Sequence, residues 1–472
     1  MPVPDYTNFV QHPRRIHFIG IGGIGMSALA LLCLNRGWKV GGSTLGHNEN
    51  TSALTAQGAE IFLNHAAENL GESTECVVYS SAIAESNPEI QAARLRNIPI
   101  LHRSTLLRAF VHPLRTIGVS GTHGKTTTTS LLGHTIYAAH HQPLILSGGI
   151  MTHWNSPIYP GKGTIAVVEA DESDHSHVNF SSLEGAILTN IEGDHMENYG
   201  GSLDNVWASF QRFLQLSRHF ASVCGDAIAP KNPWLQNVSC PITFYGTGSN
   251  ADFCAENIRT TETGMRFDCL TPAGKWTDVS LNLWGHHNVL NALAVLSTCT
   301  HLHLSEDQIR FGLSTFSGVA RRLTHVGNRG NVPIIDDYAH HPTEITAVLK
   351  TLNDRGFRRI LAICQPHRYT RLRDCMELFS RCFQHADKIV LLPVYSAGEE
   401  VISDAESVDL AKKLTDLHHS VAMVPSWPQC TTDIGRLIDG GSYDVVVCMG
   451  AGDVTHLAKD LIETPLGNSS NE

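Results

Sequence analysis

Short apolar runs alternate with stretches of helical periodicity along most of the chain, and this pattern falls into three regions. In the first region we expect strands at residues 16–20, 38–42, 75–80 and 98–102. Short strands that alternate with helices are typical of parallel βαβ units. We place the end of this region at His112-Pro113, because the residue before a proline is biased away from helix.

The second region begins with a strand and continues in the same alternating manner. Its expected strands lie at residues 115–120, 165–170 and 185–191, followed by a helix at 205–216. From Asp226 to Gly285 the chain is polar and rich in turn residues, which favours an antiparallel insertion. We assign strands of this insertion to residues 242–246, 264–270 and 279–285, and a helix to 285–299.

The third region begins near Ala320 and again alternates strands with helices. Its expected strands lie at residues 332–337, 359–364, 388–395 and 443–450. The three regions predict an α/β fold with three domains, at residues 1–113, 114–319 and 320–472. The length of 472 residues agrees, since a domain commonly has about 100–200 residues.

Composition narrows the functional classes. With 34 basic and 45 acidic residues the formal charge is −11, which argues against binding to bulk nucleic acid or to an anionic membrane. The 12 cysteines form no CxxC pair, so we expect buried, reduced thiols and a cytoplasmic protein. Residues 16–34 are nearly uncharged, but their four glycines favour a strand, a glycine turn and a buried helix over membrane insertion.

The strongest chemical motif follows the strand at 115–120. A glycine-rich loop lies between this strand and a helix, and it consists of Gly121, Thr122, His123, Gly124, Lys125, Thr126 and Thr127. Glycines allow backbone N–H groups to converge on phosphate oxygens, and a helix N-terminus adds positive potential. Lys125 adds a charge for the β- and γ-phosphates, and Thr126 a hydroxyl for Mg²⁺. The spacing departs from the regular GxxxxGK[ST] pattern, so we interpret this loop as a variant phosphate loop.

Acidic side chains follow two further strands of the second region. Glu169 directly follows an apolar strand, with Asp171, Glu172 and Asp174 after it. The other strand leads to Asn190, Glu192, Asp194 and His195. Ligands bind at the carboxyl ends of strands in open α/β sheets, so we expect these groups near the phosphate loop. Oxygen ligands with one imidazole suit Mg²⁺ or Mn²⁺, although Glu172 and Asp174 also fit solvated loop acids.

A second glycine motif, Gly20, Gly22, Gly23 and Gly25, lies between the first strand and a helix. A GxGxxG turn in this position is typical of dinucleotide binding, which requires an acid at the end of the second strand. That strand instead ends at Ser43-Thr44. A nicotinamide site is therefore disfavoured. Two interpretations stay open: the turn binds a diphosphate, or it only allows a helix to pack closely.

Polar groups also follow the strands of the third region. Residues 334–344 contain two acids, a tyrosine and the pair His340-His341, and residues 365–374 contain three arginines. The adjacent histidines lack zinc-ligand spacing. We therefore expect Arg368 and its neighbours to bind phosphate or carboxylate, or to form an ordinary charged surface helix.

Together these motifs resemble the Mur ligase family, the ATP-dependent amide ligases of peptidoglycan synthesis. The resemblance extends over nearly the whole chain, from GIGGIGMSALA through SGTHGKTTTT, VVEADESD, TNIEGDHMENY and DDYAHHPTE to GAGD. It implies a Rossmann-like first domain that binds a UDP-sugar, a central P-loop ATPase domain and a Rossmann-like third domain. The implied reaction joins L-alanine to UDP-N-acetylmuramate with ATP and Mg²⁺, by a monomer or homodimer.

The resemblance also implies roles for individual residues. The implied catalytic residues are Lys125, His195, His341 and Arg368, and the implied metal ligands are Thr126, Glu169 and His195. The remaining nucleotide contacts would be Asn288, Asn291, Arg322 and Asp337, and the sugar-nucleotide contacts would be the four glycines of the first motif with Ser80 and Ser81. The chain departs from the family pattern at Thr44, His286 and His177, where an acid, an arginine and a phenylalanine are usual.

The residues fit activation of a carboxylate as an acyl phosphate, which an amine then attacks. His195, His341 or a nearby acid could take the amine proton. Three alternatives remain at this point: a tripeptide-recycling ligase of the same family, a nucleotide-dependent switch that hydrolyses ATP without ligation, and a dehydrogenase that uses the first glycine motif.

Overall fold

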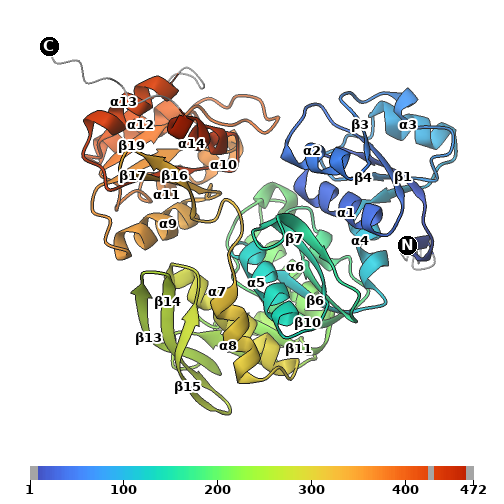
Figure 1. Cartoon of the computed structure of the whole chain (residues 1–472), viewed down its shortest axis with the longest axis horizontal. Helices are drawn as coiled ribbons and strands as arrows, with labels where there is room; N and C mark the ends of the chain where they lie inside the picture. Colours follow the sequence, from blue (N-terminus) through green and yellow to red (C-terminus); the bar gives the residue numbers. More distant parts are fainter. Residues whose placement is uncertain (1–8, 424–429, 464–472) are drawn as a thin grey trace. The chain divides into compact units, whose positions relative to one another are not determined.

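The computed structural model describes residues 9–423 and 430–463, which form three sheets of five, ten and six strands (Figure 1). The chain divides into two compact units. The first runs to residue 318, except that residues 258–266 and 283–288 belong to the second, which continues from residue 319. Among the described helices, none has the length and hydropathy needed to cross a membrane.

The sheet nearest the N-terminus is parallel throughout, with the strand order β3-β2-β1-β4-β5. Its strands are β1 (Arg15–Ile19), β2 (Lys39–Ser43), β3 (Glu60–Phe62), β4 (Cys76–Tyr79) and β5 (Ile100–His102). Its helices are α1 (Ile24–Asn35), α2 (Glu49–Ala56), α3 (Pro88–Leu95) and α4 (Arg103–Val111). The predicted strands are confirmed, and so are the strand, turn and buried helix at residues 16–34, since Met26 to Cys33 are all buried.

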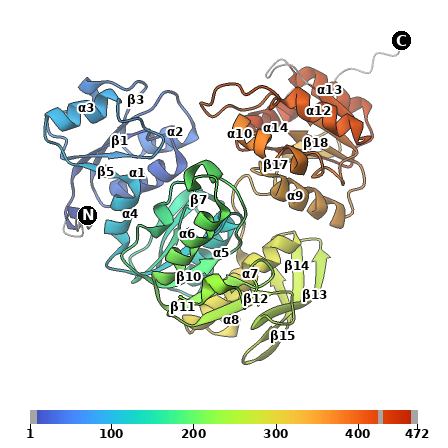
Figure 2. The same cartoon turned by 180° about the vertical axis from the view of Figure 1, so that it is seen from behind.

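The central sheet has the order β15-β14-β13-β12-β11-β10-β6-β9-β7-β8 and is visible from behind in Figure 2. Its first six strands are β6 (Arg115–Ser120), β7 (Leu144–Met151), β8 (Ser156–Pro160), β9 (Ile165–Glu169), β10 (Leu183–Leu188) and β11 (Ser217–Cys224). Its main helices are α5 (Lys125–Ala138), α6 (Leu203–Gln215), α7 (His286–His301) and α8 (Glu306–Thr315). β6 pairs in parallel with both β9 and β10, and all three are apolar and buried, as expected for the centre of a parallel sheet. Their carboxyl ends therefore lie side by side.

The predicted antiparallel insertion is wrong in part. The remaining strands are β12 (Ile242–Gly246), β13 (Phe253–Thr261), β14 (Gly264–Thr271) and β15 (Gly274–Leu281). β12 pairs in parallel with β11 and with β13, so it extends the main sheet. The sequence pattern missed β13, because only its first three residues are buried and all but one of the rest, Ile258, carry charged or polar side chains. The last strand also ends at Leu281 and not at residue 285.

The third sheet has the order β16-β17-β21-β18-β19-β20, with only the β16–β17 pair antiparallel. Its strands are β16 (Thr324–Arg329), β17 (Val332–Asp337), β18 (Ile360–Cys364), β19 (Lys388–Leu391), β20 (Val421–Met423) and β21 (Val445–Met449). Its helices are α9 (Pro342–Asp354), α10 (Tyr369–Asp374), α11 (Met376–Phe379), α12 (Ser407–Asp416), α13 (Thr431–Gly440) and α14 (Val454–Glu463). Apolar clusters cover both faces of this sheet. β19 ends before Pro393, which lacks an N–H for the ladder, so the strand predicted to residue 395 was too long.

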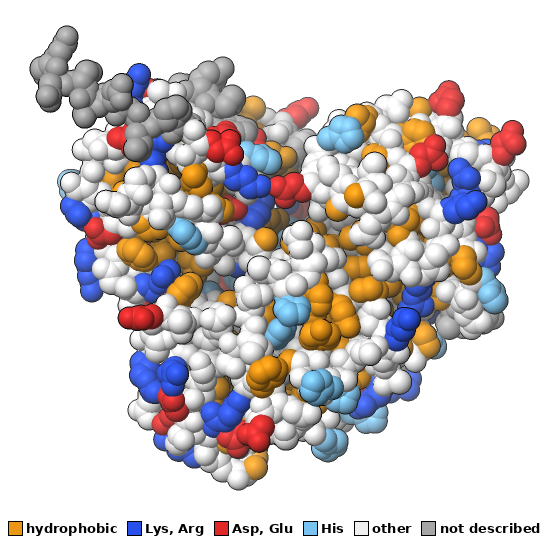
Figure 3. All heavy atoms as spheres, viewed as in Figure 1, with side chains coloured by type: hydrophobic (Ala, Val, Ile, Leu, Met, Phe, Trp, Pro, Cys, Tyr) orange, Lys and Arg blue, Asp and Glu red, His pale blue; other side chains and the backbone are white. Residues whose placement is uncertain are grey.

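The surface and the cysteines agree with the composition. On the face drawn in Figure 3, basic and acidic side chains are intermixed. All 12 cysteines are free, and all except Cys375 are buried. Burial raises the pKa of the Cys76 and Cys364 thiols to about 12, which makes these thiols poor nucleophiles.

Gly185 is a point where the central sheet requires glycine. A Cβ at this position would lie 2.1 Å from Cζ of Phe220, on the neighbouring strand β11. Overpacking of this kind typically costs about 1–3 kcal/mol. We expect Gly185→Ala to lower the free energy of unfolding by that amount in urea titrations. Gly46→Ala is the control, because no atom lies within 4 Å of its added Cβ, and equal stability of the two variants would contradict the packing.

Candidate active site

The phosphate loop, residues 121–127, follows β6 and continues into the first turn of α5. Two of its residues need positive φ: Gly121 at +136° and Gly124 at +83°. A Cβ on Gly121 would lie 2.0 Å from Oγ1 of Thr189, and one on Gly124 would lie 2.8 Å from Oδ1 of Asn291. Both glycines are therefore required by conformation and by space. The loop curls directly in front of a helix N-terminus, which is the arrangement that binds phosphate.

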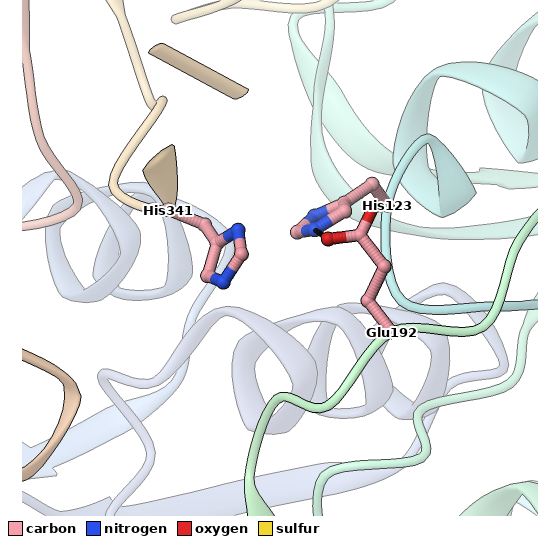
Figure 4. Close-up of side chains that lie close together, drawn as sticks. All are labelled: His123, Glu192 and His341. Atoms are coloured by element: carbon pink, nitrogen blue, oxygen red, sulfur yellow. Dashed lines mark ion pairs between the residues drawn. The ribbon is translucent and has the colours of Figure 1, made fainter. Parts of the chain in front are cut away.

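The segment after β10 holds this curl in place. The main-chain N–H of Thr122 donates to the carbonyl of Asn190, and that of His123 donates to the Asn190 side chain at 2.8 Å. Asn190 returns a hydrogen bond to the carbonyl of His123 at 3.0 Å. Figure 4 shows the imidazole of His123 and the carboxylate of Glu192 pointing toward one another, with 3.4 Å between Nε2 and Oε2. The expectation that the polar segment after β10 lies near the phosphate loop is confirmed.

Lys125 is folded back into its own loop. Its Nζ donates to the carbonyls of Gly121 and Thr122 at 2.8 and 3.0 Å, and to Oε1 of Glu172 at 2.9 Å. Burial by itself would lower the pKa of Lys125, but the charges of Glu172, Asp171 and Glu169 outweigh burial and raise it. The ammonium is therefore a permanent positive charge at the centre of the loop.

Glu172 and Asp171 are neighbours in sequence whose pKa values shift in opposite directions. Burial raises the pKa of Glu172 to about 7, although Lys125 opposes this shift. Burial also acts on Asp171, but Arg103 and Lys125 outweigh it and lower its pKa to about 2. Arg103 lies 3.0 Å from Asp171, and this contact accounts for the difference between the two acids. The contact of Glu172 with Lys125 excludes the alternative of a solvated loop acid.

Two of the three predicted metal ligands lie together. Oγ1 of Thr126 donates to Oε1 of Glu169 at 3.0 Å, while Oε2 of Glu169 accepts from the N–H of Gly148 at 2.6 Å. Burial raises the pKa of Glu169. A hydroxyl and a carboxylate beside a phosphate loop are hard oxygen donors that fit Mg²⁺. His195 lies 3.6 Å from Asp194 and 3.9 Å from Glu197, so its place in this set stays a prediction.

The glycine turn, residues 20–25, links β1 to α1 in the N-terminal sheet. The N–H groups of Gly20 and Ile21 donate to the carbonyl of Ser43, at 2.9 and 3.0 Å. The side-chain amides of Asn48 and Asn50 donate to the carbonyl of Gly22. These bonds fix the turn at the carboxyl end of the sheet, where a ligand of an α/β domain binds.

The predicted residues Ser80 and Ser81 follow β4 at the same edge. Ser80 accepts the N–H of Ile83 in a turn. Ser81 donates to Oδ2 of Asp174 at 3.1 Å. Within the first unit, Ser81 therefore connects the N-terminal sheet to the acidic segment after β9.

Arg103 is a residue of this site that the sequence did not single out. It begins α4, and its NH2 donates to Asp171 at 3.0 Å and to Asp174 at 2.8 Å. Its NH1 would lie 3.4 Å from a Cβ added to Gly25 of the glycine turn. Arg103 thus lies between the glycine turn and the acids next to Lys125. No motif marks Arg103 in the sequence. The only hint was the segment of residues 171–174, which has three acids and no basic residue.

In the second unit, three predicted residues lie around the start of α9. His341 caps α9 and is 3% exposed. Asp337 is buried, and its two oxygens accept the N–H groups of Leu323 and Ala339, both at 2.7 Å. Burial raises the pKa of Asp337 to about 6. Arg322 lies over the ring of Tyr338, 5.2 Å from its centre.

Two further predicted residues of the second unit lie elsewhere. Arg368, which precedes α10, has a positive φ of +72° and donates to Oε1 of Glu399 at 2.6 Å, so it pairs with a carboxylate of the loop after β19. Asn288 donates to the carbonyl of Trp284 at 2.8 Å, whereas Asn291 belongs to the first unit and lies beside Gly124. The roles of these residues toward a ligand stay predictions.

His177 occupies a core position behind the acidic segment. Its ring is fully buried, 5.4 Å from that of Phe210 and 6.0 Å from that of Phe213. Its Nε2 lies 3.1 Å from Oγ of Ser209. Burial lowers the pKa of His177 to about 4. A neutral imidazole thus occupies the place of the usual phenylalanine.

Family models of three consecutive domains match most of the chain. They are described as the Mur ligase family catalytic domain at residues 15–113, the Mur ligase middle domain at 119–299 and the Mur ligase glutamate ligase domain at 321–452. Together with the three sheets, these matches confirm the expected three-domain α/β fold.

Curated relatives match over nearly their full length. A UDP-N-acetylmuramate–L-alanine ligase of Maricaulis maris is 39% identical over 93% of this chain and 94% of its own. One of Brucella ovis is 38% identical over 95% and 97%. The crystal structure of a UDP-N-acetylmuramate–alanine ligase from Thermotoga maritima has a TM-score of 0.81 at 29% identity, with 96% and 99% covered. A murein peptide ligase from Psychrobacter arcticus is 22% identical with a TM-score of 0.70, over 97% and 100%, and is similar in fold.

The pairing of Arg103 with two acids predicts a cost when the cation is removed. In Arg103→Ala, Asp171 and Asp174 lose their guanidinium while Lys125 and Glu172 stay. Removing one partner of a fully buried pair costs about 3–5 kcal/mol, and because Arg103 is partly exposed we expect a loss of about 2 kcal/mol in urea titrations. Arg94→Ala breaks an exposed pair with Glu85 and should cost less than about 1 kcal/mol. Equal losses in the two variants would contradict the role of Arg103.

The lowered pKa of His177 predicts a pH-dependent stability. The unfolded chain binds a proton at this residue below about pH 6.5 and the folded chain only below about pH 4, so stability falls as the pH falls between these values. The loss approaches about 3 kcal/mol for a shift of this size.

We expect His177→Phe to remove this part of the loss, as urea titrations at pH 7 and 4.5 would show. His219→Gln, at a side chain that is 65% exposed, should keep the pH dependence of the native chain. The account is wrong if the native chain and His177→Phe lose the same free energy between the two pH values.

Proposed function

Because the chain belongs to the Mur ligase family, we propose that it is an ATP-dependent ligase that joins L-alanine to the carboxylate of UDP-N-acetylmuramate in peptidoglycan synthesis. The observation that carries this proposal is the match of 38–39% identity, over nearly the full length, to ligases of that name. The phosphate loop, with Lys125 folded back into it, supplies the matching chemistry. The neighbour with the peptide-ligase name supports the fold alone, since its identity is 22%.

The reaction has two steps that require no covalent enzyme intermediate. A carboxylate oxygen of the sugar nucleotide attacks the γ-phosphorus of ATP, and the bond from that phosphorus to ADP breaks. The amine of L-alanine then attacks the acyl phosphate carbon, and phosphate leaves. The first step depends on positioning and charge neutralisation, which the N–H groups of the first turn of α5 and the ammonium of Lys125 supply.

We assign the metal site to Thr126, Glu169 and His195. The first two form a pair of oxygen donors, and an imidazole is acceptable to Mg²⁺ or Mn²⁺. A divalent ion there would neutralise charge on the nucleotide phosphates. Glu169 is held toward this place by the N–H of Gly148.

We assign binding of the sugar nucleotide to the glycine turn with Ser80 and Ser81. Contacts to ATP and to the reacting groups are assigned to Asn288, Asn291, Arg322, Asp337, His341 and Arg368. We leave three candidates for the proton that the amine loses: His341, a nearby acid, or His195 if it does not ligate the metal. We further propose domain boundaries at residues 113 and 319, a cytoplasmic location, and a monomer or homodimer without nucleic-acid partners or membrane insertion.

The test is phosphate release from ATP in the presence of UDP-N-acetylmuramate, screened over amino acids and the tripeptide. We expect release with L-alanine and a product whose mass equals that of the amide. Lys125→Ala should reduce the rate at least about 100-fold, as loss of a charge-stabilising group does. Lys162→Ala is the control, since this lysine is exposed on a loop of the same domain.

Each other outcome points to one of the alternatives. Release that needs no amino acid would favour a nucleotide-dependent switch. Release with the tripeptide but not with L-alanine would favour the recycling ligase.

A further inference from the structure

A buried carboxylate with four polar partners lies beneath the glycine turn. Glu89, in the first turn of α3, is 0% exposed. Its Oε1 lies 2.8 Å from Nδ2 of Asn69 and 3.2 Å from Nε2 of His17. Its Oε2 lies 2.5 Å from Oγ of Ser43 and 3.2 Å from Nδ1 of His65. An ionised group without solvent contact is costly unless it is fully paired, so this network needs an explanation.

The partners come from four different elements of the N-terminal sheet. His17 lies on β1, Ser43 ends β2, His65 follows β3, and Asn69 belongs to a short 3₁₀ turn at residues 67–69. Burial alone would raise the pKa of Glu89, but the hydrogen bonds from His17, Ser43 and Asn69 outweigh burial and lower it. The carboxylate is thus ionised, and it links the middle of β1 to the carboxyl end of β2 and to the segment after β3.

Ser43 connects this network to the glycine turn. Its hydroxyl donates to Glu89 at 2.5 Å, and its carbonyl accepts the N–H groups of Gly20 and Ile21 at 2.9 and 3.0 Å. Both groups belong to Ser43, so the hydrogen bond that fixes its hydroxyl also restricts the position of its carbonyl. Glu89 itself, being fully buried, does not contact a ligand.

We propose that Glu89 is a positioning residue for the sugar nucleotide: acting through Ser43, it fixes the main chain of the glycine turn on which the diphosphate binds. The proposal rests on the proposed function for the identity of this ligand. The proposal also gives a reason for the ionised carboxylate. A dinucleotide-binding domain usually has an acid at the end of the second strand. Here that strand ends in Ser43, and the carboxylate reaches its hydroxyl from α3.

The inference predicts a selective loss of sugar-nucleotide affinity. Glu89→Gln offers one acceptor oxygen where the carboxylate has two, so either Ser43 or Asn69 loses its acceptor. Ser43→Ala removes the link and leaves the other three partners of Glu89. We expect either change to raise the Kd for uridine diphosphate, measured by calorimetry, about tenfold, which equals about 1.4 kcal/mol. The KM for UDP-N-acetylmuramate should rise by the same factor, while kcat and the KM for ATP change less than about twofold.

A matched control separates positioning from general loss of stability. Val111→Ala truncates a buried core side chain of the same domain and should lower the Tm without changing the Kd for uridine diphosphate. If Glu89→Gln does not fold, Ser43→Ala carries the test alone. An unchanged Kd in the folded variants, an equal rise in the KM for ATP, or the same shift in Val111→Ala would overturn the inference. Because binding is measured without turnover, a failure of the proposed function would appear separately, as absent ligation by the native chain.

Discussion

The ammonium of Lys125, whose side chain is only 13% exposed, is the group on which the rest of the site depends. A cation removed from water is tolerated only when it is surrounded by acceptors, and here two carbonyls of its own loop and the Glu172 carboxylate supply them. The carbonyls can reach Nζ only because the loop curls at Gly121 and Gly124, both with positive φ. The curl requires glycine at position 121, because a Cβ there would collide with Thr189. Hydrogen bonds from the loop to Asn190, after β10, hold the curl in place.

The acids that balance Lys125 need cations of their own. Asp171 and Glu172 are adjacent, and two carboxylates beside a single ammonium would repel one another. Arg103 resolves this by pairing with Asp171 and Asp174 from the N-terminal domain. The pairs Lys125–Glu172 and Arg103–Asp171 thus connect the phosphate loop to the start of α4 within the first unit.

The sequence was informative where a strong local rule operates. Apolar runs between turn residues predicted β6, β9 and β10 of the central sheet and the central strands of the other two sheets, but not β11. The strand–loop–helix pattern predicted the phosphate loop together with the acids at its side. It failed for β13, whose exposed half has the polar composition of a loop, and for the parallel pairing of β12, because pairing depends on contacts distant in sequence. Arg103 and Glu89 were missed for the same reason: a lone charged residue has no pattern until the fold brings its partners to it.

The central claim is that the loop from Gly121 to Thr126 binds the phosphates of ATP. The most direct measurement is a crystal structure with magnesium and a non-hydrolysable ATP analogue. The account predicts β- and γ-phosphate oxygens within hydrogen-bond distance of the N–H groups of this loop and of Nζ of Lys125. A triphosphate bound elsewhere, with Lys125 still held by Glu172 and its loop carbonyls, would contradict it.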